Sequence, residues 1–155
     1  MTLNFQKGLY YFSILKKLLI KIKSMIEKTV LVFYDSTCVL CDRSIIWLIK
    51  NDLNNVLRFA HVSGPIAQKQ AFTVSTEAIS VITPSGEYYK SSQAVLYLLL
   101  KIRRYKPFYS FLKLFPVKLL NFFYRKIAAN RYRWFGQYSE CKIPDESIKS
   151  RFLDF

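Results

Sequence analysis

Short apolar runs and longer amphipathic stretches alternate through the middle of the chain. Three runs rich in β-branched and aromatic residues predict buried strands. These runs occupy residues 29–34, 56–61 and 78–83. The turn sequence Pro-Ser-Gly-Glu that follows the third run predicts a hairpin, with a partner strand at 88–90.

Apolar positions at helical spacing separate these runs and predict helices. The helical stretches cover residues 38–51, 91–104 and, more weakly marked, 65–71. The resulting order is strand, helix, strand, helix, hairpin and helix. It indicates an α/β domain that begins near residue 29 and continues to residue 155.

The carboxyl-terminal part becomes helical and basic from about residue 105. Pro107 and Pro116 predict breaks, and therefore two further helices near 107–115 and 117–132. Residues 101–135 carry ten Lys or Arg and no Asp or Glu. We expect these helices to form a cationic addition to the α/β core.

The first 28 residues alternate apolar and basic positions at roughly helical spacing, which predicts an amphipathic basic helix. Its uncharged apolar stretches are far shorter than the ~20 residues of a bilayer-spanning helix, and its internal lysines are not typical of a secretory signal. One hypothesis is a helix that lies in an anionic membrane surface. The alternative is a segment that packs loosely beside the domain, or that is not translated because synthesis starts at Met25.

Composition narrows the class of protein. With 155 residues, 52% of them hydrophobic, the chain fits one domain with a substantial core. Three cysteines are too few for a secreted disulfide scaffold, so we expect a reducing compartment, the cytoplasm. The net charge of +14 predicts an acidic partner. No RNA-binding or helix-turn-helix motif is present, so we expect peripheral contact with an anionic membrane rather than with nucleic acid.

Two cysteines stand where the first predicted strand turns into a helix. Cys38 and Cys41 have the spacing Cys-x-x-Cys, and the free N–H groups and dipole of a helix start favour a thiolate. A thiol one turn later can attack a mixed disulfide formed by the first. We assign Cys38 as the attacking nucleophile and Cys41 as the resolving thiol, which we expect to be less exposed. The alternative is two inert buried thiols.

Three charged residues are candidates to support these thiols. Asp35 could move a proton to and from Cys41 if burial raises its pKa, or it could hold the turn as a capping carboxylate. Arg131 and Arg133 come near the end of the last predicted helix, where cations complement the helix dipole. Either could reach back to Asp35 or orient a substrate near the thiols.

A zinc site is a further alternative. Cys141 and the only histidine, His61, would complete a Cys₃His set with Cys38 and Cys41, although a second close-spaced pair is missing. Cys141 could instead form a regulatory disulfide with Cys38, or be a structural buried cysteine. We expect no bound metal and no cofactor.

The element order together with the position of Cys-x-x-Cys resembles a thioredoxin-like domain. Thioredoxins and glutaredoxins usually have a proline with a cis peptide just before the third strand, beside the thiols. This chain has Ser-Thr-Glu-Ala there, at 75–78. We therefore expect its dithiol to meet the substrate differently.

Several blocks also resemble the DCC thiol-disulfide oxidoreductase family, which is named for one Asp and two Cys. The first block holds Asp35, Cys38, Leu40 and Cys41, with Ser36 where the family usually has Gly. The later blocks are Ser92-Gln93-Ala94-Val95, Tyr124, Ala128, Asn130-Arg131-Tyr132-Arg133, Phe135-Gly136, Cys141, Pro144 and Arg151-Phe152-Leu153. The resemblance covers about residue 30 to the end. It implies a thioredoxin-like fold and protein-disulfide reductase activity.

These observations lead to two hypotheses. In the first, the protein is a thiol-disulfide oxidoreductase that acts on a disulfide-containing protein or small molecule, with an external thiol reductant. In the second, it is a basic aromatic module that binds anionic membrane or nucleic acid and has structural cysteines. Both hold together if the basic face places the thiols at a membrane.

Overall fold

The computed structural model describes residues 29–140 and 145–154. The predicted amino-terminal helix and Cys141 lie outside these residues. The elements are β1 (Val30–Tyr34), α2 (Val39–Asn51), β2 (Leu57–His61), α3 (Pro65–Gln68), β3 (Ser80–Ile82), β4 (Tyr88–Lys90), α4 (Ser91–Lys101), the 3₁₀ turn η1 (Arg103–Tyr105), α5 (Lys106–Leu112), α6 (Val117–Phe135) and α7 (Glu146–Lys149).

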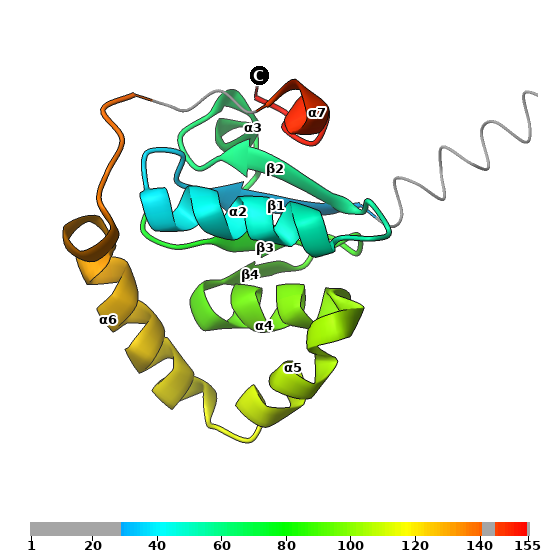
Figure 1. Ribbon diagram of the computed structural model, residues 1–155, viewed down its shortest axis with the longest axis vertical. Coiled ribbons are helices and arrows are strands. Elements are labelled where there is room, and N and C mark those ends of the chain that lie inside the picture. The colour runs from blue at the N-terminus through cyan, green and yellow to red at the C-terminus, as the bar shows by residue number, and fades with distance from the viewer. Residues whose placement is uncertain (1–28, 141–144, 155) are drawn as a thin grey trace, which may run out of the picture.

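The four strands form one mixed sheet in the order β2-β1-β3-β4. Strand β1 pairs with β2 in parallel and with β3 in antiparallel orientation, and β3 and β4 form the predicted hairpin. The β1–β2 pair needs a crossover connection, which α2 supplies (Figure 1). The mixed sheet and its helices confirm the predicted α/β, thioredoxin-like fold.

Alternation along β1 sends side chains to both faces of the sheet. Val32 and Tyr34 are buried in a cluster with residues of α2 and α4. Phe33, between them, is buried on the other face together with Ala67 of α3. The sheet is therefore covered on both sides, and α2, which begins with the cysteine motif, packs on the larger core.

Two predicted helices have different ends in the structure. Helix α3 covers only Pro65–Gln68, rather than 65–71. The chain beyond it is irregular and inserts Val74 into the smaller core. The helix predicted over 91–104 ends at Lys101, because the backbone of Ile102 is extended before the 3₁₀ turn begins.

The carboxyl-terminal residues close the free edge of β2, which the sequence did not predict. The Phe59 N–H donates to the Arg151 carbonyl, and the Leu153 N–H donates to the Phe59 carbonyl, both at 2.9 Å. The Phe152 ring packs 5.5 Å from the Phe59 ring. Arg151 also forms an ion pair with Asp52. These contacts protect the strand edge from pairing with another chain.

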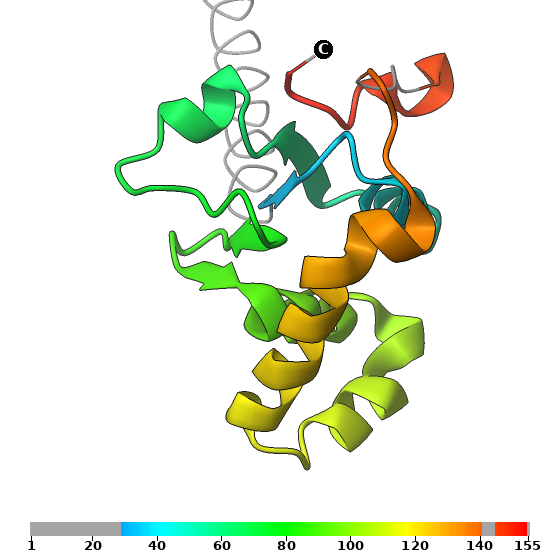
Figure 2. The ribbon, with the colours of Figure 1, turned by 90° about the vertical axis from the view of Figure 1, so that its left-hand side faces the viewer.

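Helices α5 and α6 form a V that extends from the body, and α6 returns toward the start of α2 (Figures 1 and 2). The Ser92 hydroxyl of α4 donates to the Asn121 side-chain oxygen of α6 at 2.6 Å. This contact helps to set α6 across the sheet end where the cysteine motif lies. Among the described helices, none is long and apolar enough to cross a membrane.

Candidate active site

The cysteine motif begins at the carboxyl end of β1. Cys38 is the N-cap of α2 and has an extended backbone, and its Sγ accepts a hydrogen bond from the Cys41 N–H at 3.3 Å. A sulfur in this position satisfies one of the free N–H groups of the helix start, and the helix dipole favours negative charge there. Both cysteines are free thiols.

The expected order of exposure is wrong. Cys38 is 0% exposed, whereas Cys41 is partly exposed. Residues 136–138, here called the crossing segment, follow α6 and pair with the backbone of the cysteine loop. The Tyr138 N–H donates to the Thr37 carbonyl at 2.8 Å, and Gln137 forms an isolated antiparallel bridge with Cys38. A segment almost 100 residues away is thus paired with the loop whose cysteine, placed by local sequence at a helix start, is fully buried.

The thiol of Cys41 has a raised pKa. Burial is the main cause, followed by the contact with the Cys38 sulfur, and the nearby Arg131 charge offsets only part of the effect. Cys41 therefore carries its proton at neutral pH, while its own N–H donates to the Cys38 sulfur. This asymmetry suits one sulfur that attacks and one that resolves.

Both carboxylate oxygens of Asp35 accept hydrogen bonds. Oδ1 accepts the Thr37 N–H at 3.0 Å and the Thr37 hydroxyl at 2.8 Å. Oδ2 accepts Arg131 Nη2 at 2.8 Å and a very short hydrogen bond from the Tyr132 hydroxyl. Burial opposes ionisation, but the hydrogen bonds from Tyr132 and Thr37 and the Arg131 charge together lower the pKa of Asp35. Proton transfer to and from Cys41 would require a raised pKa for Asp35, and this pKa is lowered instead. The contacts of Asp35 match the other alternative, in which its carboxylate holds the turn.

Arg131 reaches the site, as one of the sequence alternatives predicts. It is 7% exposed, and its Nη1 donates to the Glu77 carbonyl at 2.6 Å while Nη2 binds Asp35. One guanidinium thus ties α6 to the loop before Cys38 and to the loop before β3. Arg133 is exposed and does not line the cavity described below, because it lies on another side of the same helix.

The loop before β3 takes the place where thioredoxins have their proline. Besides the Glu77 carbonyl, the Ile79 N–H is bound, since it donates to the Tyr124 hydroxyl of α6 at 2.9 Å. No peptide bond in the described residues is cis. Two backbone groups of this loop are therefore already paired with side chains of α6.

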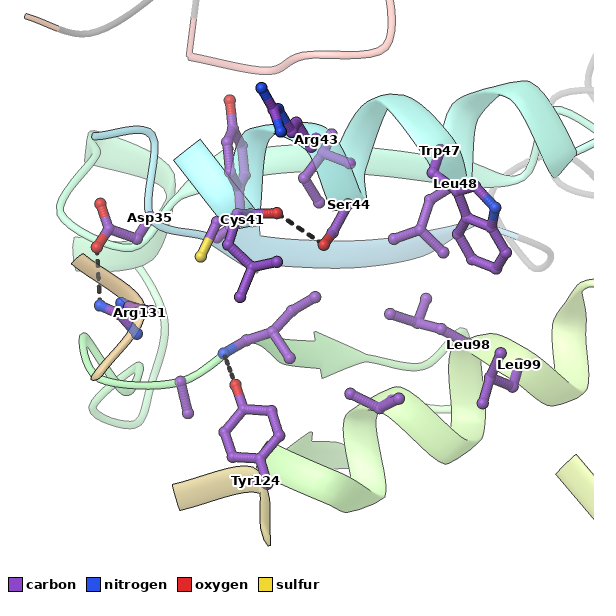
Figure 3. A pocket seen from close by; sticks show the side chains of 16 residues that line it. Asp35, Cys41, Arg43, Ser44, Trp47, Leu48, Leu98, Leu99, Tyr124 and Arg131 are labelled. Carbon is purple, nitrogen blue, oxygen red and sulfur yellow. Dashed lines mark hydrogen bonds and ion pairs between the residues drawn. The ribbon is translucent and has the colours of Figure 1, made fainter. Parts of the chain in front are cut away.

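A cavity of about 380 Å³ opens beside Cys41, between α2, α4 and α6. Asp35, Cys41 and Arg131 lie at one end of it, and Trp47, Leu98 and Leu99 lie at the other (Figure 3). The remaining lining is mainly aliphatic, from Leu40, Ile45, Leu48, Ile79 and Val95. An apolar cavity with a few convergent polar groups at one end is typical of a binding site.

The structure does not assemble the zinc set. Within residues 29–140 and 145–154, no three His, Cys, Asp or Glu side chains are grouped so that they could hold a metal ion. His61 packs its ring 5.3 Å from the Tyr34 ring, and burial lowers its pKa. The role of Cys141 stays open, since it lies outside the described residues.

Two tyrosines of α6 have site roles that sequence reasoning did not assign. Tyr132 binds Asp35, and Tyr124 binds the loop before β3. The available signal was the spacing of Tyr124, Ala128 and Arg131, which places three residues on one helix face. Nothing in the sequence indicated that the crossing segment pairs with the cysteine loop.

Comparison with known proteins agrees with this geometry. The family model of DCC1-like thiol-disulfide oxidoreductase matches residues 32–137, which include both cysteines, Asp35 and Arg131. The chain is 31% identical over 126 residues to the uncharacterised protein YuxK of Bacillus subtilis, which covers 77% of this chain and 90% of that protein. It is 28% identical over 126 residues to a chloroplastic DCC family protein of Arabidopsis thaliana, which covers 76% of this chain and 71% of the relative. No solved structure matches the chain significantly. The chain therefore belongs to the DCC1-like thiol-disulfide oxidoreductase family.

Proposed function

We propose that this protein reduces protein disulfides through a dithiol cycle in which Cys38 attacks and Cys41 resolves. The observation that carries the proposal is the arrangement at the start of α2. The Cys38 sulfur is the N-cap and accepts the Cys41 N–H, and the Cys41 side chain faces the cavity one turn later. Family membership supports the same chemistry.

In the proposed cycle, the Cys38 thiolate forms a bond to one sulfur of the substrate disulfide. The disulfide bond of the substrate breaks, and its other sulfur leaves as a thiolate that takes up a proton. Cys41, once deprotonated, attacks the Cys38 sulfur and releases the second substrate thiol. The substrate gains two electrons, and Cys38 and Cys41 form a disulfide. An external thiol reductant of the kind found in the cytoplasm then restores the dithiol.

Attack by Cys38 requires the crossing segment to move. Hydrogen bonds join this segment to the cysteine loop and the start of α2. They include the Tyr138 N–H to the Thr37 carbonyl at 2.8 Å, the Val39 N–H to the Gly136 carbonyl at 3.4 Å, the Tyr138 hydroxyl to Asp42 at 3.3 Å and the Gln137 side-chain N–H to the Thr37 hydroxyl at 3.5 Å. Local openings of such short segments cost much less than global unfolding. We infer that the substrate reaches Cys38 when residues 136–138 are displaced.

The cavity suits an apolar side chain next to the cysteine of the substrate. In thioredoxins the loop before the third strand meets the substrate, but here Arg131 and Tyr124 already bind two backbone groups of that loop. The cavity beside Cys41 is open and mainly aliphatic. We infer that the cavity binds the substrate in place of the loop before β3.

Asp35 and Arg131 are positioning residues in this proposal. Their ion pair fixes the turn that holds Cys38, and the lowered pKa of Asp35 keeps its carboxylate ionised through the cycle. Arg131 also places a positive charge near the Cys41 sulfur, because both residues line the same end of the cavity.

The test is reduction of insulin by the wild-type protein and by Cys38→Ser, with Cys141→Ser as the matched control at the third cysteine. We expect activity to be lost in Cys38→Ser and kept in Cys141→Ser. Cys41→Ser should accumulate a mixed disulfide between Cys38 and the substrate. Equal insulin reduction by wild type and Cys38→Ser would refute the proposal, and a trapped species in Cys38→Ser instead would reverse the two roles.

A further inference from the structure

Helices α5 and α6 and the turn between them expose many large apolar side chains. They include Phe108, Phe111, Leu114, Phe122, Phe123 and Ile127. Leu114, at the tip between the two helices, is 80% exposed. We call this set of residues the α5–α6 surface, and Figures 1 and 2 show the two helices that carry it as a V.

Helix α6 has two different apolar faces. Tyr124, Ala128 and Arg131 follow one another at helical spacing and lie toward the site and α4. Phe123 and Ile127 follow the same spacing on an adjacent side, about 100° around the helix axis, where both are exposed. One apolar face serves the fold, and the other is uncovered in the part of the chain that the structure describes.

The exposed area is large for a small protein. A whole phenylalanine side chain buries about 200 Å², and four phenylalanines of this surface are about half exposed. Together they present roughly 400 Å² of apolar surface, before the aliphatic residues are added. Apolar patches of this size are often functional.

The charges around this surface have one sign. Residues 101–135 carry ten Lys or Arg and no Asp or Glu. All of these cations except the buried Arg131 are exposed. Lys113 and Lys118 flank the exposed tip at Leu114. The occupant of the surface must therefore accept apolar side chains and be negatively charged.

An anionic lipid bilayer meets both requirements. Its acyl boundary takes up Phe and Leu side chains, and its headgroups attract Lys and Arg. A second copy of the chain would bring like charges together. Nucleic acid would bind the cations and stack on aromatic rings, but it offers nothing to the aliphatic side chains of Leu114 and Ile127.

We propose that the α5–α6 surface docks on an anionic lipid bilayer, with its tip inserted at the level of the headgroups. This proposal does not rest on the redox activity. Docking would nevertheless affect the redox activity, because α6 runs from the α5–α6 surface to the active site. Phe122 and Arg131 are nine residues apart on α6, or about 14 Å along its axis. Docking would hold the dithiol close to the membrane, where disulfides of membrane proteins are within reach.

The experiment measures binding of the full chain to phosphatidylcholine vesicles with and without phosphatidylserine, at low and high salt. We expect binding only with phosphatidylserine and weaker binding at high salt. Lys113→Ala/Lys118→Ala should weaken it about 25-fold, since each lysine contributes about fivefold near an anionic surface. Leu114→Ser/Phe123→Ser should weaken it by about tenfold or more.

The matched controls carry the same substitutions away from the surface. Lys50→Ala/Lys69→Ala removes two exposed lysines, and Leu53→Ser/Leu153→Ser removes two exposed leucines. Both should bind vesicles like wild type, and thermal unfolding verifies that every variant is folded.

Four results would overturn the proposal. The wild type could fail to bind phosphatidylserine vesicles. The surface variants could bind as well as the controls, which would assign any lipid binding to another part of the chain, such as residues 1–28. Leu114→Ser/Phe123→Ser could leave vesicle binding intact and abolish a dimer, which would assign the surface to a second copy. The surface variants could lose binding to RNA but not to vesicles, which would assign it to nucleic acid.

Discussion

Arg131 joins three parts of the site, so its replacement tests the architecture directly. Arg131→Met removes the charge and all hydrogen bonds but keeps a long unbranched side chain. The side chains of Arg131 and Asp35 are 9% and 14% exposed, so the variant leaves a carboxylate that is nearly buried and has lost its cation. Removing one partner of a buried ion pair costs about 3–5 kcal/mol.

We expect the lower end of that range, about 3 kcal/mol, because Asp35 keeps its hydrogen bonds from Thr37 and Tyr132. A domain of this size has a free energy of unfolding of about 5–15 kcal/mol, so the variant should still fold. The assay is urea unfolding at neutral pH. Arg133→Met is the matched control: this arginine is exposed on the same helix, and its change should stay within about 0.5 kcal/mol.

A double-mutant cycle with Asp35→Asn isolates the pair. If the ion pair holds the turn, the double variant should lose less stability than the sum of the single variants, with a coupling of about 1–3 kcal/mol. Two results would refute this role of the ion pair: additive losses of stability in the double variant, or an Arg131→Met variant as stable as Arg133→Met. Either result would show that the contact between α6 and the cysteine loop contributes nothing to stability.

The remaining predictions concern access, specificity and pH. Gly136 has φ +90° and ψ 171°, which only glycine adopts readily. Gly136→Ala should therefore loosen the crossing segment and speed alkylation of Cys38 by about tenfold or more; an unchanged rate would contradict its role as a cover. Val95→Phe should fill the cavity and raise the KM for peptides with an apolar residue beside the disulfide, while peptides with polar neighbours are unaffected; equal effects on both would disprove the subsite. Because the pKa of Cys41 is raised, release of a trapped substrate should speed up about tenfold per pH unit between about pH 6 and 8, and a flat profile would contradict this. Because the folded pKa of Asp35 lies below 3.8, its stabilisation is present above about pH 4 and is lost as pH falls through the folded pKa. Urea unfolding should therefore show a steeper acid loss in wild type than in Asp35→Asn, and parallel curves would argue against it.

Local patterns in the sequence were sufficient for the elements of the core. The β-branched run at β1 and the turn before Cys38 act over a few residues, so strand and helix could be predicted in order and position. The hairpin of β3 and β4 followed from its turn in the same way. The short helix α3 was predicted too long, because its irregular continuation is held by tertiary burial of Val74.

The same distinction between local and distant contacts applies to the candidate site. The spacing of Cys38 and Cys41 and the nearness of Asp35 are properties of neighbouring residues. The partners of these groups come from far along the chain: Arg131 meets Asp35 across 96 positions. The sequence left open which arginine would reach the site, and it could not indicate which segment pairs with the cysteine loop.

The sequence by itself determined that this protein has a dithiol at a helix start, on an α/β core, with a basic helical addition. These are consequences of periodicity, capping and spacing, which act within one element. Only the tertiary structure decided that Cys38 is covered and Cys41 faces the cavity, that Asp35 stays ionised, and that one face of α6 builds the site while the other stays exposed. Burial and charge pairing depend on which distant segments pack together. Helix α6 brings Arg131 and the crossing segment to the cysteine motif.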